Sequence, residues 1–226
     1  MGVAIGEILT PALGVAISPF PIVSVILMLT SGRGRARGPA FALGWMIGLA
    51  AMVGFLLIVS DRLGIEPSDD GPSTAASIVR LLLGMGLLVL ATKKWRSRSE
   101  GGDTPAPPGW MQSIERANPA RAAVLGAGLS GLNPKNLMFN LVAGTAIASA
   151  DTTPRGEAIT WVTYVLLASI LVIGPVAWYL LAPASASPSL TLARHWLIRY
   201  SGVMVGMVLV LIGVSQVGGA ISDLAS

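Results

Sequence analysis

The sequence predicts an all-α polytopic membrane protein in which six transmembrane helices form two inverted three-helix repeats, with helices one and four broken at proline. Three observations lead to this fold class. Of the 226 residues, 53% are hydrophobic and only 12% are charged, which is far more apolar than a soluble domain. Six apolar segments approach the length of about 20 residues that crosses a bilayer. One proline-containing motif also occurs in both halves of the chain.

The apolar segments define the predicted helices and the organisation of the chain. They cover residues 8–30, 39–60, 77–92, 122–150, 158–182 and 201–220. The first segment lacks a basic start and carries Glu7 at its head, so we do not expect a cleaved signal peptide. The chain then divides into a first three-helix repeat at 1–96, a cytoplasmic linker at 97–121 and a second three-helix repeat at 122–226.

The distribution of charge predicts the orientation in the membrane. Cytoplasmic loops retain lysine and arginine during insertion. Most of the basic residues lie in the first, third and fifth loops, the last of which carries Arg194 and Arg199. The opposite loops carry few basic residues and collect acidic ones. We therefore expect a multi-pass protein of the plasma (inner) membrane with both termini outside.

The linker has two parts of different composition. Residues 97–109 are rich in Ser, Gly and Pro, which is typical of a solvated linker. After them Trp110, Met111, Ile114 and Ala117 recur at roughly helical spacing. This pattern fits a short helix along the cytoplasmic interface, and it equally fits an ordinary loop with a few apolar residues.

The repeated motif carries the prediction of broken helices. It reads Ile17-Ser18-Pro19-Phe20-Pro21-Ile22 in the first segment and Leu132-Asn133-Pro134-Lys135-Asn136-Leu137 in the fourth. Proline removes a helix hydrogen bond, and membrane interiors tolerate unpaired backbone only beside protein or a water-filled cavity. Because each half has an odd number of spans, the second half enters from the opposite face, as in many secondary transporters. The matched prolines predict a shared midplane cavity; the alternative is a pair of ordinary proline kinks.

Polar residues near the second proline mark a candidate binding site. Asn133, Asn136, Asn140 and Gly144 have spacings that place them along one helical stripe. Lys135 is costly near the bilayer centre and needs a partner, a cavity or the interface. An anionic substrate would supply that partner. The alternatives are interhelical hydrogen bonding by the asparagines and a lysine that snorkels to the cytoplasmic surface.

Other signals are weaker and bear on partners and chemistry. The chain has no cysteine, no metal-ligand cluster and no phosphate-binding loop, so we predict no cofactor and no metal site. The basic residues flank the membrane segments, which argues against nucleic-acid binding. Small-residue pairs at 44 and 48 and at 202 and 206 would allow close helix contact within one subunit or in a homodimer. An intramembrane enzyme would need Ser130 and His195 to meet; we instead predict that the protein is not an enzyme.

Several short motifs, taken in order, resemble those of one membrane family. They are Ser18-Pro-Phe-Pro21, Phe41-Ala-Leu-Gly-Trp45, Gly109-Trp-Met111, Pro119-Ala-Arg-Ala122 and Leu132-Asn-Pro-Lys-Asn-Leu137. Together they resemble the Sap family of sulfolipid-addressing and glycopeptidolipid-addressing proteins over nearly the whole chain. The resemblance implies a place in the lysine exporter superfamily of six-helix transporters.

The resemblance also implies a function. It suggests a plasma-membrane exporter that moves a glycolipid or another amphipathic, anionic envelope precursor outward by alternating access. Carried over by position, the candidate substrate-binding residues are Ser18, Pro19, Pro21, Asn133, Pro134, Lys135, Asn136 and Asn140. The superfamily's amino-acid exporters usually have Pro-Gly-Pro in the first helix, whereas Phe20 replaces the glycine here, which suits an amphipathic substrate. Export of amino acids or other small solutes, and a non-transporting accessory role in lipid export machinery, stay open as alternatives.

Overall fold

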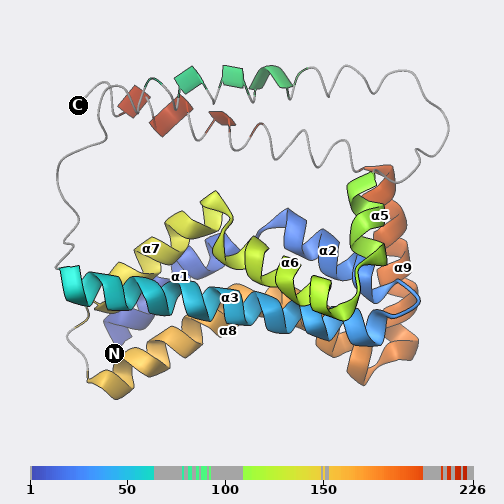
Figure 1. Ribbon diagram of the computed structural model, residues 1–226, viewed down its shortest axis with the longest axis horizontal. Helices are drawn as coiled ribbons and strands as arrows, with labels where there is room; N and C mark the ends of the chain where they lie inside the picture. The colour runs from blue at the N-terminus through green and yellow to red at the C-terminus, as the bar shows by residue number, and fades with distance from the viewer. Residues whose placement is uncertain are drawn as a thin grey trace. The chain divides into compact units, whose positions relative to one another are not determined.

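The computed structural model describes residues 2–63, 109–148 and 153–200, together with residue 150 and scattered residues within 78–92 and 210–222. The chain divides into two compact units, and the helices discussed below belong to the unit of residues 1–66 and 109–194, apart from the end of α9. The helices are α1 (Gly2–Ala16), α2 (Pro19–Leu29), α3 (Gly34–Leu63), α5 (Gly109–Arg116), α6 (Pro119–Gly131), α7 (Pro134–Ala148), α8 (Pro154–Leu181) and α9 (Pro183–Arg199). The described part is all-helical (Figure 1), which agrees with the all-α part of the predicted fold class.

Two of these helices are long and apolar enough to cross a membrane. They are residues 34–58 of α3 and the whole of α8, which match the predicted second and fifth segments. The bent pair of α1 and α2 becomes a third candidate if it is counted as one span. The predicted third and sixth segments, at 77–92 and 201–220, lie largely outside the described residues.

The first predicted break is present between α1 and α2. The two helices meet at an angle of 57° across Ile17 and Ser18. Pro19 is the first residue of α2, where its fixed φ suits the helix and its missing N–H costs nothing. Pro21 also lies in the first turn, where backbone N–H groups have no helical partner. The prolines therefore start the second half-helix, and the break itself falls just before them.

A second break follows the same pattern in the other half of the chain. Helix α6 ends at Gly131 and α7 begins at Pro134, with Leu132 and Asn133 between them. Figure 1 shows α7 turning away from α6 at this point. The repeated motif thus forms the same local structure twice, a helix end followed by a proline-started helix.

Helices α3 and α6 pack closely along their lengths through glycines, and Figure 1 shows them side by side. A Cβ atom added at Gly44 would lie 1.9 Å from the carbonyl oxygen of Ala123. One added at Gly48 would lie 2.6 Å from the carbonyl oxygen of Ala127, and one at Gly126 would lie 2.2 Å from that of Phe41. The predicted close contact at Gly44 and Gly48 is therefore made within one subunit. The corresponding pair at 202 and 206 is outside the described residues.

Helix α2 is buried nearly all around. Helices α3, α5 and α8 pack against it, and Pro21 and all residues from Val23 to Leu29 are buried. A helix that is apolar all round is buried in a protein core or in a membrane. The packing encloses α2 beyond its first turn, where Phe20 is exposed, whereas α7 keeps an exposed face that includes Met138 and Leu141.

The linker and the predicted fifth loop both contain helix. Helix α5 forms where the sequence fitted either a short helix or an ordinary loop. Met111 of this helix is buried, with 1% of its surface exposed. The membrane-interface location of α5 stays a prediction. The segment between 182 and 201, predicted as a cytoplasmic loop between two spans, contains α9 over most of its length. Its side of the membrane stays a prediction. Pro183 stands at the helix start, where proline is tolerated, and Ala186 and Leu190 are buried one turn apart.

Candidate functional site

The two helix breaks lie against each other. The hydroxyl Oγ of Ser18 donates a hydrogen bond of 3.3 Å to Oδ1 of Asn136, although the two residues are 118 positions apart in the chain. Ser18 is 3% exposed and Asn136 is fully buried. Buried polar groups in an apolar protein require such partners. The fold therefore joins the break of the first half to the first turn of α7 in the second half.

Lys135 reaches across this junction to the first break. Its Nζ donates hydrogen bonds to the carbonyl oxygen of Ile17 at 3.2 Å and to Oγ of Ser18 at 3.3 Å. The ammonium also lies 5.7 Å from the centre of the Phe139 ring. The residue as a whole is exposed at the surface of this unit. The sequence predicted that Lys135 needs a partner, and the partners in the structure are a backbone carbonyl and a hydroxyl.

Two asparagines of α7 donate hydrogen bonds to the last turn of α6. The side-chain amide of Asn136 donates to the carbonyl oxygen of Leu129 at 2.9 Å, and that of Asn140 donates to the carbonyl oxygen of Ser130 at 3.4 Å. Both carbonyls belong to the last turn of α6, where helix geometry supplies no backbone donor. The asparagines thus satisfy the backbone that the second break leaves unpaired.

Tyr164 of α8 completes the buried polar network. Its hydroxyl donates a hydrogen bond of 2.8 Å to Oδ1 of Asn140, and both residues are fully buried. Sequence reasoning did not select Tyr164. The available signal was a tyrosine near the start of an apolar predicted span, whose hydroxyl needs a partner when buried.

Asn133 differs from its predicted position. It precedes α7, so it does not share the helical stripe of Asn136, Asn140 and Gly144, all of which are buried on α7. Its Oδ1 instead accepts a hydrogen bond of 3.0 Å from the backbone N–H of Lys135. The reason is that Pro134 starts a new helix, which places the preceding asparagine at a capping position.

The structure brings most of the predicted site residues to one place. Ser18, Lys135 and Asn136 are in direct contact, and Asn140 continues the network to α8. Pro19, Pro21 and Pro134 start the two half-helices, and Asn133 caps the second one. That these residues bind a substrate, and that a water-filled cavity lies between the two segments, stay predictions.

The serine considered for an enzymatic role is buried in helix packing. The hydroxyl of Ser130 donates to the carbonyl oxygen of Ala127 in its own helix at 3.0 Å. A Cβ atom at Gly48 would lie 2.3 Å from this hydroxyl oxygen, so α3 covers it closely. No cluster of three or more His, Cys, Asp or Glu side chains that could hold a metal ion occurs among the described residues.

The fold and this junction define an all-helical membrane protein with two paired helix breaks. The model of the family described as Sap, sulfolipid-1-addressing protein, matches residues 8–222, and the chain belongs to this family. This confirms the resemblance seen in the sequence motifs. The family is one of lipid-addressing proteins and not a family of enzymes. Comparison with curated proteins and with solved structures gives no match.

Proposed function

We propose that this protein is a plasma-membrane exporter that moves an anionic, amphipathic envelope lipid or precursor outward by alternating access. The observation that carries the proposal is the meeting of the two helix breaks at Lys135. Paired discontinuous helices that place polar backbone at membrane depth are the usual substrate site of secondary transporters. Membership of a sulfolipid-addressing family supports a lipid as the substrate class.

The packing of the helices supports two inverted repeats. If α1 with α2 corresponds to α6 with α7, and α3 corresponds to α8, then the contacts of the two halves should be reciprocal. Helix α1 packs against α8 of the other half, and α6 packs against α3 of the other half. With predicted third and sixth spans added, this is the six-helix plan of the lysine exporter superfamily. The halves would then rock against each other around the junction.

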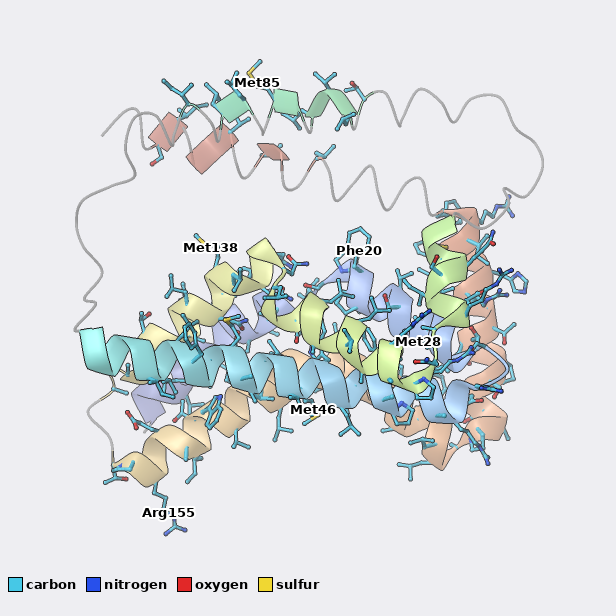
Figure 2. All side chains as sticks on the ribbon, in the orientation of Figure 1. Phe20, Met28, Met46, Met85, Met138 and Arg155 are labelled. Atoms are coloured by element: carbon cyan, nitrogen blue, oxygen red, sulfur yellow. The ribbon has the colours of Figure 1, made fainter. Side chains whose placement is uncertain are left out.

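Lys135 is suited to bind the anionic group of the substrate. An ammonium has three N–H donors, and Lys135 uses two of them on Ile17 and Ser18. The third can bond to a sulfate, phosphate or carboxylate. Phe20 and Met138 are exposed and project away from α2 and α7 in Figure 2, which places apolar surface on both half-helices for acyl chains.

A single-cysteine experiment tests this role. The chain contains no cysteine, so Lys135→Cys provides one modifiable position without further changes. In proteoliposomes, transport of a headgroup-labelled anionic glycolipid should fall at least about tenfold, because a hydrogen bond to a charged group contributes about 1.5–3 kcal/mol. Aminoethyl methanethiosulfonate restores a positively charged side chain and should recover transport, whereas a sulfonatoethyl reagent should not.

Arg155→Cys is the matched control. Arg155 is exposed and projects from the start of α8 in Figure 2, so modifying it should leave transport unchanged. Undiminished transport by a folded Lys135→Cys protein would refute the proposed role of the lysine. In cells, lipid profiling of a deletion strain on the two sides of the plasma membrane should show the substrate retained inside.

A further inference from the structure

The end of α1 is an oxygen-rich, electronegative position. Helix α1 ends at Ala16 and has no basic residue in its last turn. The carbonyl groups of a last turn lack helical donors and carry the negative end of the helix dipole. The N–H of Ile17 satisfies only the carbonyl of Leu13. The first break therefore needs additional positive charge or hydrogen-bond donors.

The two breaks meet this need in different ways. At the end of α6, Asn136 and Asn140 supply neutral amide donors from the helix that follows the break. In the repeated motif, Pro21 stands where the second half has Asn136, and the side chain of proline has no hydrogen-bond donor. The first half thus lacks the donor that closes the second break. A charged group from the other half, Lys135, takes its place.

Two oxygen atoms and one aromatic ring surround the Lys135 ammonium. The carbonyl oxygen of Ile17 lies at 3.2 Å from Nζ and the hydroxyl oxygen of Ser18 at 3.3 Å. The Phe139 ring lies 5.7 Å away and packs on α1, because a Cβ atom at Gly14 would be 2.5 Å from it. Backbone carbonyls at half-helix ends are the groups that coordinate coupling Na⁺ in transporters with broken helices.

We propose that Lys135 is a tethered cation that occupies, at the end of α1, a position where a soluble monovalent cation such as Na⁺ would otherwise bind. Because a residue of the chain fills this position, the stability of the first break does not depend on bound sodium. If the exporter function proposed above holds, on which this consequence rests, transport by the wild type needs no Na⁺ at this site. Removing the lysine side chain creates a vacant cation site formed by Ile17, Ser18 and the Phe139 ring.

Thermal unfolding of purified protein tests the proposal without a transport assay. The Tm is measured for wild type and Lys135→Ala in NaCl, KCl and choline chloride at equal concentration. The Lys135→Ala protein should have a lower Tm in choline and should regain about 2–4 °C in NaCl or KCl, as expected for saturation of a weak cation site. The wild type should show no difference between the salts, because its site is already filled.

Two further variants give the result its specificity. The double variant Lys135→Ala with Ser18→Ala lacks one of the oxygen ligands and should lose the rise in Tm that NaCl or KCl gives over choline chloride. Arg155→Ala removes a positive charge at an exposed position and should behave like wild type in all salts. If Lys135→Ala protein cannot be purified in choline, its recovery in NaCl provides the same evidence.

The proposal is overturned if the Tm of Lys135→Ala is the same in sodium and choline, if wild type shows the same rise, or if no salt recovers the variant. Such a result leaves the exporter function standing. Loss of transport in Lys135→Cys without a cation-specific change in Tm would assign the lysine to the substrate alone.

Discussion

The close packing of α3 on α6 allows a quantitative prediction for Gly44→Ala. The added Cβ atom would lie 1.9 Å from the carbonyl oxygen of Ala123, and ordinary contact begins at 3.4 Å. The helices must therefore separate locally by about 1.5 Å, because the obstructing atom is backbone and cannot rotate away. Overpacking of this kind costs about 3 kcal/mol at its upper end. Alanine regains about 1 kcal/mol over glycine in a helix interior, which leaves a net loss of about 2 kcal/mol.

This loss should lower the Tm of the purified protein by about 4–8 °C, measured by the intrinsic fluorescence of the tryptophans during heating. The matched control is Gly128→Ala on α6, where an added Cβ atom has no neighbour within 4 Å. The control should keep or slightly raise the Tm because only the helix propensity changes. Equal Tm values for the two variants would refute the packing described for α3 and α6.

Two further predictions concern the polar contacts. Tyr164→Phe leaves Oδ1 of Asn140 without its 2.8 Å hydrogen bond. The loss of about 1 kcal/mol should lower the Tm by about 2–4 °C, whereas Tyr179→Phe on the same helix should leave the Tm unchanged. Equal effects of the two substitutions would contradict the assigned contact. Glu115 of α5 pairs with Arg194 of α9 at 2.7 Å. A double-mutant cycle of Glu115→Gln and Arg194→Gln should give a coupling free energy of about 0.5–1 kcal/mol that decreases with added salt, and strictly additive effects would exclude this ion pair.

The sequence was informative where structure depends on local chemistry. The positions of the broken helices followed from prolines, which act on their own turn of the chain and start α2 and α7. The apolar segments identified α3 and α8 because the length of a membrane helix follows from hydropathy alone. Lys135 and the asparagines were selected because charged and amide groups are costly in lipid wherever the chain places them.

The tertiary structure decided which groups pair with one another. The sequence by itself determined that Lys135 needed a partner, but the partner is the carbonyl of Ile17, 118 residues away, and every residue has such a carbonyl. Asn133 does not share the expected stripe because its side chain caps the start of α7, and α9 is a helix within the predicted fifth loop. Local patterns specify where a helix begins, ends or cannot continue. The contacts between distant segments depend on how all the helices pack together, and that information belongs to no single stretch of the chain.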